Sequence, residues 1–267
     1  ALSFVVAGAV NAWLGWQWAL VPGAMGAALA FLFVLVGLPA RRPQPSAGPR
    51  PALLDFRPIL RNRSALAYSL AYCVHTWEMN ALRGWAVAFL AWVAMTTGEP
   101  NAWLAPTVVA TAMGLIGTWA SVAGNELSIR LGRQRLVRLA MGSSMVCAAL
   151  IGFVGGQSYA LASALVLLYG LLIWLDSSSL TAGAAGSAEP HRRGATLALH
   201  SMLGYFGGFL GPLAIGWILD LSGGMSTRGW GLAFLHIAVV IFLGRIAFIW
   251  LGPRSLAGDR VAAPVKL

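Results

Sequence analysis

The sequence predicts an all-α, polytopic membrane protein for three reasons: its composition, its long uncharged runs and the distribution of its basic residues. Hydrophobic residues make up 58% of the 267 residues and charged residues only 10%, whereas about a quarter of a soluble domain is charged. Residues 1–40, 100–125, 139–175 and 194–219 contain no Asp, Glu, Lys or Arg, and a membrane-spanning helix needs about 20 such residues. A water-soluble globular fold is therefore excluded.

Apolar length and the Gly, Pro and charge punctuation between the runs predict seven complete membrane helices and one partial helix. The first run is divided by Gly15-Trp16-Gln17-Trp18, which leaves an initial piece too short to cross. We expect the chain to begin partway through a membrane helix. The predicted spans are about 1–14 (partial), 18–39, 64–95, 103–127, 136–154, 159–187, 195–220 and 230–251.

The basic residues alternate between the two sides of these spans. Arginines and the lysine gather in residues 40–63, 130–138, 192–193 and 254–266, whereas the connections between them carry Arg228 alone. Short basic loops stay in the cytoplasm, so the sequence predicts a cytoplasmic C-terminus in a plasma membrane, the inner membrane if the cell is bacterial. The net charge of +10 is thus explained by topology, and no nucleic-acid partner is expected.

The long basic connection at residues 40–63 divides the chain unequally, with two predicted spans before it and six after it. This asymmetry suggests a two-bundle transporter in which residues 1–39 are the last two helices of the first bundle. Residues 40–63 are then a cytoplasmic linker, 64–251 a six-helix bundle and 252–267 a cytoplasmic tail. For the second half of the linker, a short interfacial helix and a plain loop both remain open.

The stretch "GNELSIRLGRQR", residues 124–135, follows the fourth predicted span. It resembles the cytoplasmic-loop signature of the major facilitator superfamily, although Ile129 stands where that signature has an acid. The resemblance extends to the layout of residues 1–251 and implies a loop that gates transport from the cytoplasmic side; the alternative is a basic loop that only sets topology. The matching residues are Gly124, Glu126, Arg130, Gly132, Arg133 and Arg135.

Several polar residues lie inside predicted spans, where an ionisable group costs at least about 2.5 kcal/mol unless it faces a cavity or a partner. His75, Glu78 and Arg83 fall on one broad helix face. Asp176 lies at a similar depth in the span at 159–187. Under the resemblance, the two acids lie on the helices that lead two inverted repeats, where such transporters bind solute and coupling ion. We therefore predict a solute or proton pathway of Glu78, Arg83, His75, Asp176 and Asn80.

Two alternatives stay open for these residues. Arg83 either neutralises Glu78 in an ion pair that only holds helices together, or binds an anionic substrate.

His200 is expected to be a core or interfacial histidine rather than a proton carrier. A run of small residues in the same span predicts close helix packing, which serves either stability or a moving gate: Gly204, Gly207, Gly208 and Gly211, followed by Pro212.

The predicted function is secondary active transport of a small solute by alternating access, with protons as the expected coupling ion. The partners are then a solute, the lipid bilayer and protons. A membrane sensor or scaffold that binds a ligand without moving it is the alternative. The sequence contains no H-E-x-x-H, G-x-S-x-G or G-x-x-x-x-G-K-[ST] motif and no Cys/His metal cluster. No enzymatic activity, cofactor or metal is therefore expected.

Overall fold

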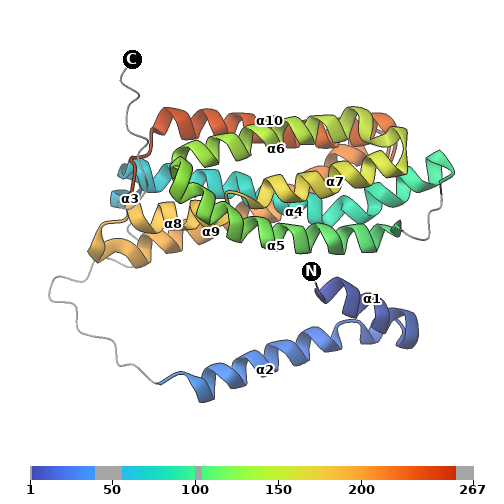
Figure 1. Ribbon diagram of the computed structural model, residues 1–267, viewed down its shortest axis with the longest axis horizontal. Helices are drawn as coiled ribbons and strands as arrows, with labels where there is room; N and C mark the ends of the chain where they lie inside the picture. The colour runs from blue at the N-terminus through green and yellow to red at the C-terminus, as the bar shows by residue number, and fades with distance from the viewer. Residues whose placement is uncertain (1, 40–55, 100–103, 257–267) are drawn as a thin grey trace. The chain divides into compact units, whose positions relative to one another are not determined.

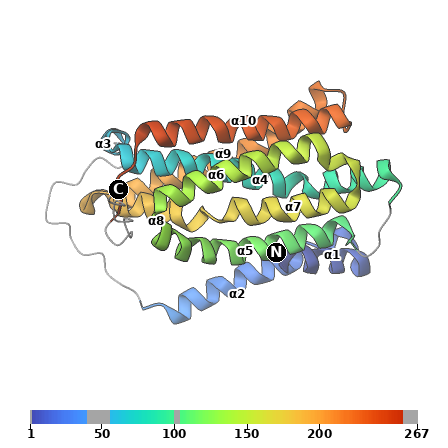
Figure 2. The same ribbon diagram turned by 45° about the horizontal axis from the view of Figure 1, so that its top comes forward.

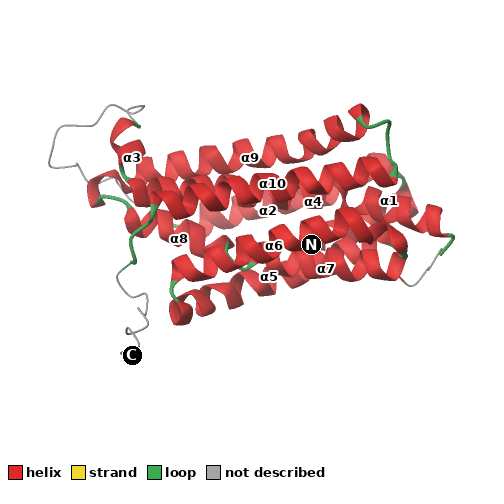
Figure 3. Ribbon diagram, turned by 90° about the horizontal axis from the view of Figure 1, so that it is seen from above, coloured by secondary structure: helices red, strands yellow, loops and turns green. Residues whose placement is uncertain are grey.

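The computed structural model describes residues 2–39, 56–99 and 104–256, and within these residues every regular element is a helix (Figure 3). The all-α prediction is confirmed. The chain divides into two compact units, Ala1–Asp55 and Phe56–Leu267. The boundary falls inside the predicted linker, of which residues 40–55 lie outside the described part of the chain.

The first unit contains α1 (Leu2–Leu14), the short 3-10 helix η1 (Trp16–Trp18) and α2 (Val21–Gly37). The predicted division at Gly15 is present: Gly15 has a φ of 92°, a backbone conformation that glycine adopts without steric cost. Helix α2 belongs to a candidate membrane span, Trp16–Gly37. A helix that is apolar on all sides is typical of a membrane segment.

The second unit is a bundle whose long helices run side by side (Figures 1 and 2). Asparagine and serine side chains cap the N-termini of several helices; for example, the Asn62 side chain accepts a hydrogen bond from the Ala65 N–H (3.1 Å). Its elements are α3 (Arg57–Arg61), α4 (Arg63–Thr97), α5 (Pro106–Leu131), α6 (Arg133–Val154), η3 (Gly155–Gln157), α7 (Tyr159–Trp174), α8 (Ser177–Ser187), η4 (Pro190–Arg192), α9 (Arg193–Leu221) and α10 (Thr227–Leu251).

Six segments of the described chain are long and apolar enough to span a membrane: Trp16–Gly37, Pro106–Leu131, Arg133–Gln157, Tyr159–Ser187, Pro190–Leu221 and Thr227–Leu251. The protein is thus an integral membrane protein. Helix α4 has 35 residues, well above the about 20 needed to cross, but it is not among the six. Its polar residues, including His75, Glu78 and Arg83, lower its hydropathy.

The predicted span at 159–187 coincides with the candidate membrane span Tyr159–Ser187, but in the structure this span consists of two helices. Helix α7 ends at Trp174 and α8 begins at Ser177, with a turn at Leu175 and Asp176 between them. Interrupted membrane helices occur where backbone groups line a site or are buried in protein. At the break the Leu175 carbonyl faces Gly124 of α5, whereas the Asp176 carbonyl still accepts a hydrogen bond from the Leu180 N–H (2.9 Å).

The predicted loop between the fourth and fifth spans is also shorter than expected. Helix α5 continues to Leu131 and α6 begins at Arg133, so that Gly132 alone separates them. Its φ of 87° lies in the region that favours glycine. The arginines that were expected in a loop therefore lie on the ends of two helices.

Helix α4 occupies the middle of the second unit, in contact with α5, α7, α8, α9 and α10. Large aromatic side chains fill the space around it, including Tyr68, Phe89, Trp230 and Phe234, each at most 1% exposed. Because α4 is surrounded by protein on several sides, its polar residues can find partners within the bundle instead of facing lipid.

Candidate functional site

The carboxylate of Glu78 is enclosed by three helices in the core of the second unit. Glu78 of α4 is 2% exposed. The hydroxyl of Tyr169 in α7 donates a hydrogen bond to Glu78 Oε2 (3.1 Å). Ser144 of α6 lies nearby, and its hydroxyl donates to the Met141 carbonyl (3.3 Å). Both neighbours are neutral hydroxyl groups.

A second buried acid is paired with a histidine one turn away from Glu78. His75 Nδ1 lies 3.0 Å from Asp176 Oδ1, and both side chains are 2% exposed. Asp176 precedes the first residue of α8 and lies at the break between α7 and α8. A negative charge at a helix N-terminus is favoured by the helix dipole. The break thus gives Asp176 a position where both a histidine and a helix end offset its charge.

Aromatic stacking connects His75 to a second buried histidine. Tyr72 of α4 stacks on His75 with ring centroids 5.8 Å apart, and on His200 of α9 at 4.1 Å. His200 is 2% exposed, and its Nε2 lies 3.3 Å from the hydroxyl of Thr181. Thr181 is exposed, so a chain of polar side chains leads from the buried cluster to the surface of α8.

A cavity of about 430 Å³ lies between α4 and α9, and Tyr72, which stacks on His75, forms part of its wall. Its α4 wall continues along the helix face to Arg83, which lies one turn beyond Met79 and is exposed. Aromatic, amide and hydroxyl groups together can hold an organic solute. The lining residues are Tyr72, Thr76, Met79, Asn80, Ser201, Gly204, Tyr205, Gly208 and Phe209.

A comparison with sequence models of protein families shows which family the chain belongs to. The sequence model of the Major Facilitator Superfamily matches residues 1–212, which includes α4 and the interrupted α7–α8 pair. The chain belongs to the major facilitator superfamily. A search of curated proteins finds no match.

Members of the superfamily are typically membrane transporters rather than enzymes. Membership therefore indicates a membrane transporter, with a small-molecule solute and the lipid bilayer as its partners. Within the described residues, no group of three or more His, Cys, Asp or Glu is placed to hold a metal ion.

The structure separates Arg83 from Glu78, contrary to one of the two alternatives. Glu78 points into the core toward Tyr169, whereas Arg83 is exposed on the face that carries the α4–α9 cavity. The two positions lie 140° apart around the helix, at the two edges of the predicted broad face, and these edges meet different surroundings in the structure. The ion-pair alternative for Arg83 and Glu78 is therefore not the one that this structure contains, and Asn80 lines the cavity rather than the buried cluster.

The superfamily signature has a buried part and an exposed part. A Cβ on Gly124 would overlap the carbonyl oxygen of Leu175 at the α7–α8 break. Arg133 is 7% exposed, and its Nη1 donates to the Ser179 carbonyl (3.4 Å). The remaining charged residues of the signature, Glu126, Arg130 and Arg135, are exposed. The signature thus contacts α8 directly beside Asp176.

The glycines of α9 lie against α4, as the small-residue pattern predicted. A Cβ on Gly207 would overlap the Cys73 carbonyl, and one on Gly211 would overlap the Trp77 carbonyl. The Gly204 carbonyl accepts a hydrogen bond from the Thr76 hydroxyl (2.7 Å). In this structure α9 thus packs closely against α4 at these positions, and a gating role stays a prediction.

Tyr72, Tyr169 and Ser144 were not predicted as site residues. Tyr169 precedes Asp176 by seven residues, which places both on one helix face, and Tyr72 precedes Thr76 by four on the cavity face. These spacings were available in the sequence. Tyrosine and serine are common in membrane helices, however, and only the packing of α4 against α6, α7 and α9 distinguishes these three.

Proposed function

We propose that the chain is part of a secondary active transporter that moves a small solute by alternating access and couples this movement to protons at Glu78. The observation that carries the proposal is the environment of Glu78. It is 2% exposed, and no Lys, Arg or His among the described residues lies within ion-pair distance of it. An ionised carboxylate without a cation is costly in such a place, and protonation removes the charge.

The charges of the cluster support Glu78 rather than Asp176 as the proton carrier. The Asp176 carboxylate has the His75 imidazole nitrogen as a counter-group at 3.0 Å, whereas within the described part of the chain no such group lies beside Glu78. Loss of a proton from Glu78 leaves a negative charge without a counter-group. One proton therefore changes the charge of the bundle core, which favours different helix arrangements in the two states.

Tyr72 provides a physical connection between proton and solute. Its ring lines the α4–α9 cavity and stacks on His75, which contacts Asp176. A solute that displaces Tyr72 would thus disturb the buried cluster. Direct contact of this kind is what coupling requires, because each ligand must distinguish the same two conformational states.

The proposed orientation has the C-terminus in the cytoplasm of a plasma membrane, the inner membrane if the cell is bacterial. Arg61, Arg63, Arg254 and the arginines at the α5–α6 turn belong to connections on one side of the predicted spans, and Arg228 to the other. The positive-inside rule supports this assignment.

Flux in proteoliposomes tests the proposal. The wild-type protein is reconstituted with a pH-sensitive dye inside, and sugars, amino acids, organic acids and organic amines are added one by one. We expect one class to move protons together with labelled solute. A ligand that raises the thermal unfolding temperature but neither crosses the bilayer nor moves protons would instead establish the sensor alternative.

Arg83 is proposed to bind an anionic group of the solute. Its guanidinium is exposed on the α4 face that continues from the cavity. We expect Arg83→Gln to weaken binding of an anionic solute about tenfold or more, because a hydrogen bond to a charged group contributes about 1.5–3 kcal/mol. Arg83→Lys should restore only part of this affinity, since lysine lacks the planar fork of donors.

The measurement is ligand-dependent thermal unfolding of the purified variants. Arg228→Gln is the matched control, because Arg228 is an exposed arginine near the start of α10 and outside the cavity lining. Equal affinity in the Arg83→Gln variant and the control would show that Arg83 does not contact the solute.

A further inference from the structure

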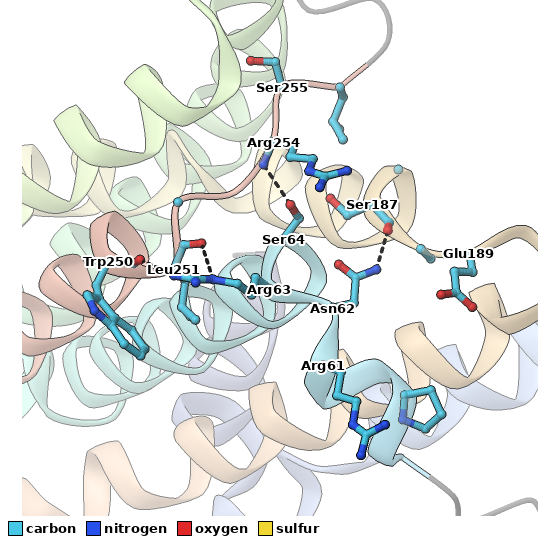
Figure 4. A pocket seen from close by; sticks show the side chains of 15 residues that line it. Arg61, Asn62, Arg63, Ser64, Ser187, Glu189, Trp250, Leu251, Arg254 and Ser255 are labelled. Carbon is cyan, nitrogen blue, oxygen red and sulfur yellow. Dashed lines mark hydrogen bonds between the residues drawn. The ribbon is translucent and has the colours of Figure 1, made fainter.

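The cavity at the cytoplasmic-side end of the second unit is separate from the solute and proton sites. It has a volume of about 850 Å³ and is formed by α3, the start of α4, the end of α8 and the residues that end and follow α10 (Figure 4). Ser64 in its wall precedes Glu78 on α4 by about 20 Å at the helical rise of about 1.5 Å per residue. The cavity is therefore distinct from the α4–α9 cavity and from the buried cluster around Glu78.

Hydrogen bonds between distant parts of the chain hold the walls of this cavity (Figure 4). Asn62 Nδ2 donates to the Ser187 carbonyl at the end of α8 (2.8 Å). The backbone N–H of Arg254 donates to the hydroxyl of Ser64 (2.8 Å). These bonds tie α8 and the segment after α10 to the start of α4, so the cavity is a built feature of the bundle.

Arg63 forms a third contact in the cavity wall, and its guanidinium is occupied by hydrogen bonds to the end of α10. Its Nη2 donates to the Trp250 carbonyl (2.8 Å) and its Nε to the Leu251 carbonyl (3.3 Å), and its guanidinium lies 5.4 Å from the centre of the Trp250 ring. The guanidinium thereby satisfies carbonyl groups at the C-terminus of α10. The Trp250 ring remains 73% exposed at the rim.

Two other arginines of the cavity keep their guanidinium groups available. Arg61 and Arg254 are exposed, and no hydrogen bond or ion pair to either guanidinium is present within the described residues. The acid in the lining, Glu189, instead lies beside Arg192 (3.4 Å) and His191 (3.5 Å). Among the described residues, therefore, no acidic side chain pairs with Arg61 or Arg254.

We propose that this cavity binds the phosphate of an anionic phospholipid from the cytoplasmic leaflet, with Arg61 and Arg254 as the phosphate-binding residues. The proposal depends on the orientation given above and is independent of proton coupling. Basic pockets between helix ends on the cytoplasmic side suit lipid head groups. The exposed Trp250 and the half-exposed Leu60 (50%) favour a lipid over a soluble anion, because tryptophan lies at the level of head groups and apolar side chains contact the acyl chains.

Lipid retention measured by native mass spectrometry tests the site. The wild-type protein is equilibrated in detergent with equal amounts of phosphatidylglycerol and phosphatidylcholine, and we expect it to retain the anionic lipid preferentially. Each arginine contributes about fivefold to the affinity for an anionic lipid, so the double variant Arg61→Gln/Arg254→Gln should lose about thirtyfold. The control Arg130→Gln/Arg135→Gln removes two exposed arginines outside the cavity and should retain the lipid as the wild type does.

Several outcomes would overturn the proposal. The wild type could retain phosphatidylglycerol and phosphatidylcholine equally, or the variant Arg61→Gln/Arg254→Gln could retain phosphatidylglycerol as well as the wild type does. If the control Arg130→Gln/Arg135→Gln lost as much lipid as that variant, only the general surface charge would matter. Inorganic phosphate distinguishes the source: if millimolar phosphate displaces the lipid from the wild type, the cavity is a soluble-anion site instead. Unfolding temperatures in phosphatidylcholine alone, expected to be unchanged in both double variants, show that folding is intact.

Discussion

Replacing Glu78 by glutamine is expected to abolish proton-driven accumulation of the solute while leaving solute exchange intact. Glutamine keeps the size of the side chain and can still accept the hydrogen bond from Tyr169, but it cannot release a proton. A gradient of one pH unit stores about 1.4 kcal/mol and supports at most about tenfold accumulation per coupled proton. In Glu78→Gln this should fall to simple equilibration across the proteoliposome membrane, whereas counterflow of labelled solute continues.

Glu99→Gln is the matched control for this experiment, because Glu99 is an exposed acid that follows α4 and belongs neither to the buried cluster nor to the superfamily signature. It should accumulate solute as the wild type does. If pH-driven accumulation and counterflow both persist unchanged in Glu78→Gln, Glu78 is not the coupling site. Asp176→Asn would then be the next variant to measure, since Asp176 is the other acid of the buried cluster.

The double substitution Gly207→Ala/Gly211→Ala should separate α9 from α4 and destabilise the protein. Each added methyl group meets a backbone carbonyl of α4, at Cys73 and at Trp77, and backbone cannot move aside as a flexible side chain can. Overpacking of this kind costs about 1–3 kcal/mol per site. The thermal unfolding temperature in detergent should fall, and transport should fall with it because the α4–α9 cavity changes shape.

Gly194→Ala is the control on the same helix. No atom lies within 4 Å of a Cβ at Gly194, and alanine favours a helix by about 1 kcal/mol over glycine. Its unfolding temperature should equal or exceed that of the wild type. If the double variant unfolds at the same temperature as Gly194→Ala, the close contact of α9 with α4 does not contribute to stability.

The position of the α7–α8 break suggests how the superfamily signature relates to the buried cluster. Gly124 of the signature contacts the Leu175 carbonyl at the break, and Arg133 binds a carbonyl of α8. Asp176 lies in the same turn and contacts His75. Backbone contacts therefore connect the α5–α6 end to the buried acids, and a gating role for the signature stays a prediction.

Much of the fold was predictable because membrane helices follow from local composition. Uncharged apolar runs identified the helices, and Gly15 identified one of their boundaries. The interruption at Leu175 and Asp176 was not predictable in the same way, since the run from Tyr159 to Ser187 is apolar enough to span a membrane without a break. Asp176 is buried because it contacts His75 of α4, and the Leu175 carbonyl fits against α5 because residue 124 is a glycine. Both contacts depend on the packing of α4 and α5 against the α7–α8 break.

The sequence by itself determined the membrane class, the helix order, the superfamily resemblance and the candidate residues, because each depends on residue type and on spacing along one helix. Only the tertiary structure decided their partners. It placed Glu78 with Tyr169, His75 with Asp176 and Arg83 on the cavity face. The physical reason is that a buried ionisable group is stabilised by neighbours from other helices, and helical spacing specifies a face without specifying which helix covers it.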